Sequence, residues 1–172
     1  MELAEVDHRE PFVPLLLEAD ESEQILRTYL FDGRLFELRH DGRTVGVVLL
    51  VADGDRVEIK NIALEEDQRG RGLGRAAIAA IATLARSEAA SSLMVGTADN
   101  SLGTLAFYEA CGFQRAGLRR GFFDAYPEPV IENGVRAHDM VMLSMSLDSG
   151  KMRVGTEHHD LMGVIDRRHL DV

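Results

Sequence analysis

The spacing of apolar residues predicts an alternation of helices and strands along most of the chain. Between residues 10 and 31 apolar side chains recur every three or four positions, which predicts two helices, the second opened by a capping box of Asp20 and Glu23. Three strands joined by short turns are expected next, over residues 34–40, 44–52 and 57–64. The first turn is Asp41-Gly42, a dipeptide typical of tight hairpins, so we expect an antiparallel meander.

The second half of the chain alternates helices and strands again. The expected elements are a helix over 72–88, a strand over 92–98, a helix over 101–110, and strands over 114–123 and 138–147. Gly112 followed by Phe113 is typical of a helix C-terminus. With an initial strand, the order is β, α, α, β, β, β, α, β, α, β, β. This order predicts an α/β fold: a single domain with a mixed, mostly antiparallel central sheet flanked by helices.

The run of apolar residues that predicts the last strand ends near residue 147, and the residues beyond it no longer show a strand pattern. We therefore expect a domain over residues 1–147 and a C-terminal extension or tail over 148–172. The extension has few apolar residues, enough for one short helix, and it contains His158, His159 and His169. We interpret these histidines as part of a surface appendage, so no metal is expected.

The charge balance argues against one large class of partner. The chain has 172 residues, 29 of them acidic and 19 basic, which gives a formal charge of −10 at pH 7. A non-specific nucleic-acid binder needs a basic surface, so an isoelectric point near 5.0 predicts no binding to nucleic acid. The single cysteine, Cys111, excludes an internal disulfide, and no Cys/His zinc motif can be built on it.

The sequence shows neither a targeting signal nor a membrane span. The N-terminus is acidic where a secretory signal would be basic. The longest apolar stretch covers residues 45–52, far below the roughly 20 residues that a membrane helix needs. We therefore expect no membrane association and a cytoplasmic location.

Residues 68–75 read Gln-Arg-Gly-Arg-Gly-Leu-Gly-Arg, which is a composition suited to binding phosphate. They join a predicted strand to a predicted helix, whose first amide groups and dipole attract an anion. The glycines allow the backbone to approach a ligand and to adopt positive φ. Arg69, Arg71 and Arg75 add cations to an otherwise acidic chain. We predict that main-chain amides between residues 69 and 75 form a nest for a diphosphate.

Other interpretations of this segment stay open on the residues alone. A dinucleotide-binding fingerprint requires the glycine spacing GxGxxG, whereas the glycines here follow GxGxG. A Walker loop requires Lys and then Ser or Thr after its last glycine, and Gly74 is followed by Arg75 and Ala76. The segment could also be a glycine-rich turn that binds nothing.

Two blocks of sequence together resemble the acyl-CoA-binding signature of the GNAT family of N-acetyltransferases. The first is Arg-x-x-Gly-x-Gly over residues 69–74, directly after a predicted strand. The second is Asn100-Ser101 followed by Ala-Phe-Tyr-Glu-Ala-Cys-Gly-Phe over residues 106–113. The resemblance covers about residues 34–147 and implies a GNAT acyltransferase domain, with acetyl-CoA as cosubstrate and CoA as product.

The resemblance also implies which residues bind the cofactor. Backbone groups of the third predicted strand would hold the acyl carbonyl and the pantetheine amides, the loop and helix start would hold the diphosphate, and an asparagine would contact the pantetheine arm. These residues are Ile62, Ala63, Leu64, Arg69, Gly70, Arg71, Gly72, Leu73, Gly74, Arg75 and Asn100. Asn100 has a second, compatible interpretation as the N-cap of the helix over 101–110.

The apolar pattern of the third predicted strand bears on the role of its backbone. Val57 and Ile59 have one parity, whereas Ile62 and Leu64 have the other. Either both faces of the strand are buried, or a bulge near Asn61 shifts the register by one residue. A bulge would leave amide groups unpaired with the neighbouring strand, and such donors can polarise a carbonyl.

Acetyl transfer from a thioester to an amine needs a base for the amine and an acid for the leaving thiolate. An alkyl amine has a pKa of about 10.4 and is almost fully protonated at pH 7. Glu58 is the candidate general base, because a glutamate at this strand position is the base in some family members. Otherwise Glu58 is a half-exposed strand residue paired with Lys60.

Tyr108 is the candidate general acid, because it holds the family's tyrosine position and its phenol is a hydrogen-bond donor. The alternative is a core aromatic near the end of a helix. Cys111 has no histidine near it in the sequence, so we expect a buried structural thiol there and not a nucleophile.

The segments that build the acceptor site in this family are acidic here. They are the first two helices and the loop between the last two strands, with Glu18, Asp20, Glu21, Glu23, Asp124, Glu128, Glu132 and Asp139. Carboxylates around the acceptor would favour a cationic amine, although the same residues can equally form the solvated surface of an acidic chain. Within the loop, the candidate substrate contacts are Tyr126, Glu128 and Glu132.

These patterns predict an acetyl-CoA-dependent N-acetyltransferase that acts on a primary amine of a small molecule or peptide by direct attack on the thioester. The alternative is a non-catalytic acyl-CoA-binding sensor module, and a nucleotide-binding enzyme is a third hypothesis. A homodimer is an expectation by analogy of fold alone.

Overall fold

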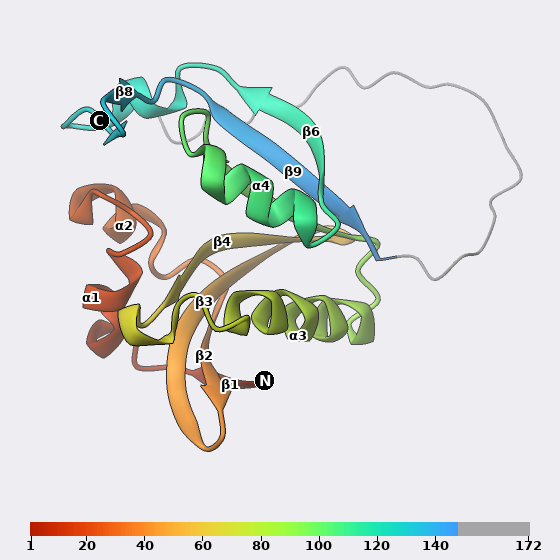
Figure 1. Cartoon of the computed structure of the whole chain (residues 1–172). Helices are drawn as coiled ribbons and strands as arrows, with labels where there is room; N and C mark the ends of the chain where they lie inside the picture. The colour runs from red at the N-terminus through yellow and green to blue at the C-terminus, as the bar shows by residue number, and fades with distance from the viewer. Residues whose placement is uncertain (148–172) are drawn as a thin grey trace, which may run out of the picture.

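A seven-stranded sheet forms the centre of residues 1–147, the part of the chain that this computed structural model describes (Figure 1). In spatial order the strands are β1 (Glu2–Val6), β2 (Arg34–His40), β3 (Arg43–Asp53), β4 (Arg56–Leu64), β5 (Ser92–Ala98), β9 (Met140–Ser146) and β6 (Gln114–Arg119). All neighbours are antiparallel except β4 and β5, which are parallel. The predicted α/β fold with a mixed, mostly antiparallel sheet is confirmed. The histidines and short helix expected beyond residue 147 lie outside the described residues.

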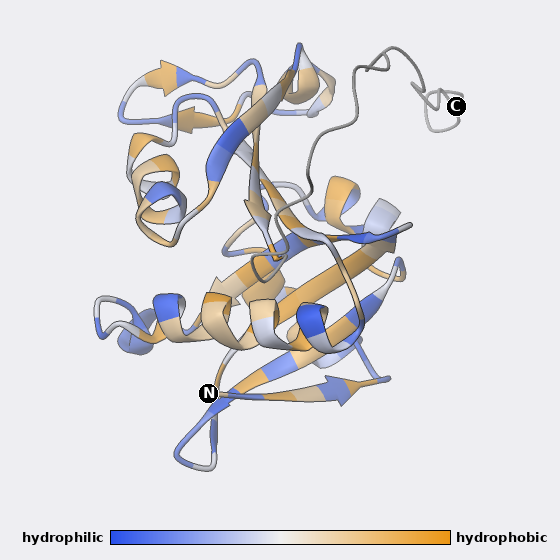
Figure 2. Ribbon diagram, turned by 90° about the vertical axis from the view of Figure 1, so that its right-hand side faces the viewer, coloured by the Kyte–Doolittle hydropathy of each residue, from blue (hydrophilic) through white to orange (hydrophobic). Residues whose placement is uncertain are grey.

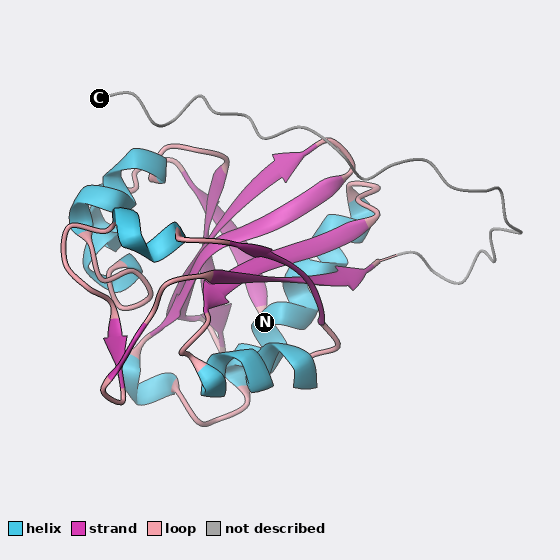
Figure 3. Cartoon of the chain, turned by 90° about the horizontal axis from the view of Figure 1, so that it is seen from above, coloured by secondary structure: helices cyan, strands magenta, loops and turns pink. Residues whose placement is uncertain are grey.

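Helices cover both faces of this sheet. Helices α1 (Val13–Leu16) and α2 (Glu23–Tyr29) pack on one face, and α3 (Leu73–Ser87) and α4 (Leu102–Ala110) pack on the other, as the view from above shows (Figure 3). Short 3₁₀ helices are η1 (Glu10–Phe12), η2 (Glu66–Gln68) and η3 (Phe122–Ala125). The loop after η3 contains a small hairpin of β7 (Ile131–Glu132) and β8 (Val135–Arg136). Within residues 1–147 no helix is long and apolar enough to cross a membrane.

The core has one apolar cluster on each face of the sheet. Along β3, Val48 and Leu50 belong to the cluster under α3 and α4, whereas Val47 and Leu49 belong to the cluster under α1 and α2. Because both faces of this strand are buried, its sequence is a continuous apolar run and not an alternating one. Figure 2 accordingly shows the central strands as predominantly hydrophobic.

Strand β4 contains a bulge, which is one of the two interpretations of its apolar pattern. Its pairing with β3 shifts by one residue between Ile59 and Asn61, so Lys60 is the extra residue. Ile59 packs into the cluster under α3, whereas Ala63, which has the same parity, packs into the cluster under α1 and α2. The bulge therefore turns the side chains that follow it to the opposite face of the sheet.

Strands β4 and β5 separate beyond this bulge. Their parallel pairing ends at Ile59 and Val95, although β4 stays paired with β3 as far as Leu64. Among residues 1–147 no strand pairs with the β5-facing edge of residues 61–64. Backbone groups on that edge are therefore available to hydrogen-bond a ligand, which is the consequence expected of the bulge.

The predicted capping box of Asp20 and Glu23 is wrong. The N-cap of α2 is Ser22, whose hydroxyl accepts a hydrogen bond from the Ile25 backbone N–H at 3.3 Å. Asp20 lies two residues earlier and is only 8% exposed. Its carboxylate accepts from the Ser22 backbone N–H at 3.0 Å, so it orders the turn before the helix and not the helix itself.

The cap predicted at Gly112 and Phe113 matches the structure. Gly112 has a φ of +100°, and the Phe113 backbone N–H donates to the Tyr108 carbonyl at 3.1 Å, which is the Schellman pattern. The strand expected over 114–123 is shorter than predicted, because Gly121, with a φ of +65°, turns the chain into η3. Tyr126 consequently comes from a compact loop and not from the end of a strand.

Candidate functional site

The loop between β4 and α3 has the geometry of an anion-binding nest. Gly70 and Gly72 have φ values of +71° and +79°, and a Cβ on either would have no other atom within 4 Å, so the space above both is open. Gly72 is the N-cap of α3, and the first bond along the helix runs from the Ala76 N–H to the Gly72 carbonyl. The amides of residues 73–75 have no acceptor within the helix and, with its dipole, favour an anion at this end.

The three arginines of this loop have different partners. Arg69 folds back, donating to the Leu64 carbonyl at 3.0 Å and pairing with Glu18 at 3.2 Å. Arg71 donates to the Gln68 side chain at 2.9 Å beside the nest. Arg75 donates to the Ala110 carbonyl at 3.2 Å, at the end of α4. Arg69 thus fastens the end of β4 to α1, a structural contact that sequence reasoning did not anticipate.

Gly74 allows the start of α3 to pack closely against the second half of α4. A Cβ on Gly74 would lie 3.2 Å from the ring of Phe107, which is tighter than an ordinary contact. Gly74 therefore has a packing reason, whereas Gly70 and Gly72 have a conformational one. The three glycines of the motif are needed for two different physical reasons.

Asn100 does not cap α4, contrary to one of its two predicted interpretations. The N-cap is Ser101, and the Asn100 side-chain amide donates to the Val135 carbonyl at 2.7 Å. The Asn100 Oδ1 atom is buried without a hydrogen-bond partner in the described part of the chain. A buried acceptor of this kind fits a ligand N–H, so the residue stays a candidate contact for the pantetheine arm.

Tyr108 lies in α4 with its ring in the core. It is 5% exposed and makes edge-on contacts with Phe107 and Phe113 at ring-centroid distances of 5.3 and 5.5 Å. Burial raises the pKa of the Tyr108 phenol, so the hydroxyl holds its proton at neutral pH and can donate it. The core position and the predicted role as an acid are therefore compatible.

Cys111 follows Tyr108 by one helical turn and is partly buried. Burial raises the pKa of its thiol, while the nearby Arg75 guanidinium acts in the opposite direction. A thiol with a raised pKa is a poor nucleophile, which agrees with the structural role expected from the sequence.

Glu58 lies on the face of β4 that α1 and α2 cover, between two cations. Its Oε1 is 3.8 Å from the Lys60 ammonium, and its Oε2 is 3.8 Å from the Arg119 guanidinium of β6. The side chain is 23% exposed, so it is accessible without lying on the open surface. The predicted pairing with Lys60 is present, and it leaves the predicted role as base open.

A buried polar network that the sequence did not reveal lies beside Glu58. The Tyr29 hydroxyl donates to Asp20 Oδ2 at 2.6 Å, and the Asn61 side-chain amide donates to the Tyr29 hydroxyl oxygen at 3.1 Å. The Lys60 ammonium lies 5.3 Å from the centre of the Tyr29 ring. Burial raises the pKa of Asp20, and the hydrogen bond from Tyr29 partly offsets that rise. A polar Asn61 inside an apolar strand was the only sequence signal for this network.

The three predicted substrate contacts of the loop lie in different surroundings. Tyr126 reaches the network, since its hydroxyl lies 3.5 Å from Asp20 Oδ2. Glu128 is exposed. Glu132 accepts a short hydrogen bond from the Ser101 hydroxyl at the start of α4. The structure therefore brings Tyr126 to Asp20 in the buried network, and it places Glu132 against the start of α4.

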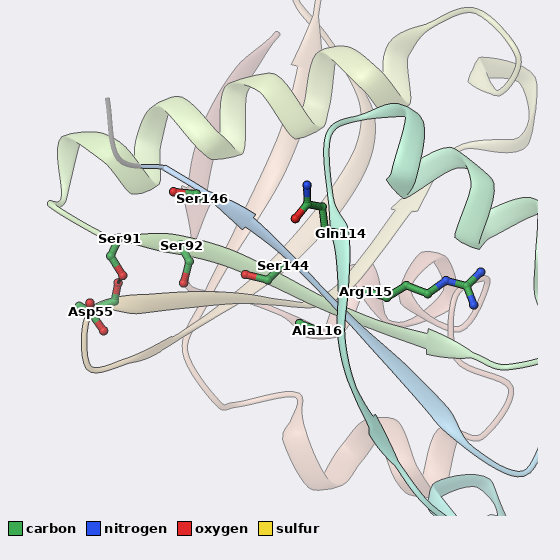
Figure 4. A pocket seen from close by; sticks show the side chains of 8 residues that line it. All are labelled: Asp55, Ser91, Ser92, Gln114, Arg115, Ala116, Ser144 and Ser146. Atoms are coloured by element: carbon green, nitrogen blue, oxygen red, sulfur yellow. Dashed lines mark hydrogen bonds between the residues drawn. The ribbon is translucent and has the colours of Figure 1, made fainter. Parts of the chain in front are cut away.

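Two surface pockets open in the described part of the chain. One opens between the start of β5 and strand β6, and is lined by Asp55, Ser91, Ser92, Gln114, Arg115, Ala116, Ser144 and Ser146 (Figure 4). Its residue Ser92 pairs with Arg56 at the start of β4, whereas the nest follows the other end of that strand. A second pocket follows α3 from Arg75 to Arg86. Residues 1–147 contain no cluster of His, Cys, Asp or Glu that could hold a metal ion.

The arrangement fits a ligand with a diphosphate and an extended amide-bearing arm. The nest supplies amide donors for the diphosphate, and the split between β4 and β5 supplies backbone groups along its length. Coenzyme A has both parts, and the orphaned Asn100 Oδ1 offers a further contact for its amides. The residues present therefore fit acetyl-CoA.

Comparison with known proteins gives one family. The model of the acetyltransferase (GNAT) family matches residues 2–113. YvbK of Bacillus subtilis, described as an uncharacterised N-acetyltransferase, is 34% identical over 135 residues, which cover 77% of this chain and 87% of that protein.

Solved structures agree with this result. A GNAT family acetyltransferase from Elizabethkingia anophelis with acetyl-CoA bound is 32% identical, with a TM-score of 0.77 over 84% of this chain and 97% of that chain. A Bacillus subtilis acetyltransferase in complex with CoA is 29% identical, with a TM-score of 0.74 over 84% of this chain and 99% of that chain. Both similarities span nearly the whole described part of the chain.

Proposed function

The chain belongs to the GNAT family of acetyltransferases, and from this premise we propose that it transfers an acetyl group to a primary amine of a small molecule or peptide. It is an acetyltransferase, and acetyl-CoA is its cosubstrate. The observation that carries the proposal is the nest at Gly70 and Gly72, which follows directly on the unpaired edge of β4. That geometry supports a thioester held along the strand, with its diphosphate at α3.

The proposed reaction is a direct attack of the amine nitrogen on the thioester carbonyl carbon. Acetyl-CoA supplies the activated acetyl group; the C–N bond forms and the C–S bond breaks. Glu58, or a water that it orders, removes the proton from the attacking nitrogen, which general-base catalysis accelerates by roughly 10²–10⁴-fold. Tyr108 donates its phenolic proton to the departing sulfur.

The positions of these two side chains support their proposed roles. Glu58 lies on the face of the sheet under α1 and α2, and Tyr108 lies under α4 on the other face. An acyl group held at the edge of β4 would thus meet a base and an acid from opposite faces. Backbone amides of the segment Ile62 to Leu64 that point to that edge would polarise the carbonyl, an effect worth a few kcal/mol where such donors are preorganised.

A direct assay tests the proposal. The full chain is incubated with acetyl-CoA and a panel of primary amines, and thiol release is followed. Release that depends on both the amine and the protein supports the proposal. Tight CoA binding without amine-dependent release above background would contradict it and favour the sensor module.

Calorimetry with CoA, ATP and NAD tests the assignment of the nest. We expect CoA to bind far more tightly than the two nucleotides, because only CoA also has an amide-bearing arm for the edge of β4. Equal binding of all three would mean that the nest recognises phosphate alone and that the split plays no part.

A further inference from the structure

Positive charge lies closer to the proposed base than the acidic sequence suggests. Lys60 and Arg119 each lie 3.8 Å from a different oxygen of Glu58. Their side chains are 25% and 44% exposed, so both are accessible to a ligand. Glu58 therefore faces two cations at the position where an amine would be deprotonated, and Lys60 also interacts electrostatically with the buried Asp20.

Most carboxylates expected around the acceptor have partners of their own. Of the eight named from the sequence, six are engaged: Glu18 with Arg69, Glu23 with Arg27, Asp124 with His138, Glu132 with Ser101, Asp139 with the Gly121 N–H, and Asp20 in the buried network. The other two, Glu21 and Glu128, are exposed. Glu18, Glu23 and Asp124 are ion-paired with arginines, Asp124 through Arg136, whereas the other engaged carboxylates accept hydrogen bonds from uncharged donors. Within residues 1–147 none of the eight forms a salt bridge with Lys60 or Arg119, which pair with Glu58.

The position of Lys60 is fixed by the fold. Lys60 is the extra residue of the β4 bulge, and its ammonium is held over the Tyr29 ring at 5.3 Å. Arg119 reaches the same carboxylate from β6, two strands beyond β5 in the sheet. Lys60 and Arg119 thus come from two separate strands and lie near the edge where we propose the acyl group. Together they form a pair of cations suited to an oxyanion, and an arginine can bind a carboxylate with two hydrogen bonds.

We infer that Lys60 and Arg119 bind an anionic group of the acceptor, so that the acceptor is an amine that also carries a carboxylate or a similar oxyanion. This inference rests on the proposed amine acetylation. The acceptor ammonium pairs with Glu58, while its anionic group lies at the two cations. A polyamine is disfavoured, because its second positive charge would meet Lys60 and Arg119. The sequence-based expectation of a purely cationic acceptor is replaced by that of a zwitterionic one.

Matched acceptors test the inference. Phenylalanine is compared with its methyl ester and with phenethylamine, and the same three forms are used for methionine and leucine, with spermidine as a polycation. The readout is kcat/KM from thiol release. For at least one side chain, we expect the free acid to exceed both forms that lack the carboxylate at least about tenfold. An ester or spermidine that matches or exceeds every free acid would overturn the inference.

Substitutions of Lys60 and Arg119 test whether these two cations cause the preference for free acids. Lys60→Met and Arg119→Met keep an unbranched apolar stem at each position and remove its charge. We expect each to reduce kcat/KM for the free acid about tenfold or more while changing the values for the ester and the decarboxylated amine much less. Arg120→Met is the matched control, since Arg120 is exposed and adjacent in sequence. An equal loss for all acceptors would mean that the two cations only position Glu58.

A binding measurement keeps the inference separate from the proposed function. Calorimetry compares N-acetylphenylalanine with its primary amide, each titrated into the CoA-loaded protein. Tighter binding of the acid, reduced in the Arg119→Met variant but not in Arg120→Met, supports the inference even if no tested amine is acetylated. Equal binding of the acid and the amide, or no binding of either, overturns it. Amine-dependent thiol release without a preference for acids would leave the proposed function intact.

Discussion

At the scale of single residues, Tyr108 combines a core position with a donor hydroxyl. Its ring packs edge-on against Phe107 and Phe113, and burial raises the pKa of its phenol. The packing fixes where the hydroxyl points, and the raised pKa keeps the proton on the oxygen at neutral pH. The fixed position suits a hydrogen-bond donor to a leaving thiolate, whereas the raised pKa by itself makes the phenol a weaker acid.

Removing the hydroxyl alone separates the packing of the Tyr108 ring from its proposed role as a proton donor. Tyr108→Phe keeps the ring, so we expect unchanged folding and CoA affinity but a kcat lowered at least about tenfold, because the sulfur leaves without a proton donor. Steady-state thiol release and calorimetry with CoA measure the two effects. A kcat equal to that of the unmodified chain across the pH range would remove Tyr108 from the mechanism.

Asp20 is the residue whose burial has a consequence for stability. Burial is the main cause that raises the pKa of the Asp20 carboxyl above its ordinary value, so the folded state binds a proton more tightly than the unfolded state does. The stability that Asp20 contributes is therefore full below about pH 4 and is lost as the pH rises through its folded-state pKa.

Asp20→Asn removes this titration while keeping an acceptor for the Ser22 N–H. We expect the melting temperature of the variant, relative to that of the unmodified chain, to increase as the pH is raised from 4 to 8. Thermal melts of both chains across that range measure the difference. A difference that falls with rising pH would show that the hydrogen bonds from Tyr29 and Tyr126 outweigh the burial.

At the scale of elements, the junction of β4 and α3 is the part of the fold that most directly binds the proposed donor. The bulge at Lys60 opens the strand edge, and the two left-handed glycines aim amides at the position for a diphosphate. Neither feature works without the other, because a diphosphate at α3 needs a path for the arm attached to it.

A charge placed in the nest tests this junction. Gly72→Asp puts a carboxylate where we expect the diphosphate, so CoA binding should be lost. Gly42→Asp is the matched control: its φ of +75° and open surroundings match those of Gly72, but it lies in the β2–β3 hairpin. Both variants should lose similar stability from the strained backbone, and only Gly72→Asp should lose CoA. Calorimetry with CoA that finds equal affinity in both variants would contradict the nest.

At the scale of the whole molecule, the seven strands form a continuous sheet that ends near Leu147. The Leu147 backbone N–H donates to the Ser91 carbonyl at 2.8 Å, its carbonyl accepts from Arg86 at 3.3 Å, and its side chain is 3% exposed. These contacts fix the end of β9 against β5 and α3. The domain boundary at residue 147 stays a prediction.

Truncation tests this boundary. A chain ended after Leu147 should keep its melting temperature within about 3 °C, because every described contact is retained. A chain ended after Leu143 should be strongly destabilised, since it loses the end of β9 and the buried Leu147, and burial of a leucine is worth roughly 2 kcal/mol. A large loss of stability in the longer truncation would show that residues 148–172 belong to the domain. The predictions of a homodimer, a cytoplasmic location and no nucleic-acid partner stay predictions at this scale.

The sequence by itself determined the order of elements, the bulge near Asn61, the glycine nest and, through its motifs, the family and the cosubstrate. These follow from local patterns, since parity, turn dipeptides and glycine spacing act over a few residues. Only the tertiary structure decided what surrounds Glu58. It joined Asp20, Tyr29 and Tyr126 from separate segments, paired most of the acidic residues, and brought Arg119 from β6 to β4. Charges distant in sequence interact only once the sheet places them within a few ångströms, so composition predicted an acidic site and the fold produced a mixed one.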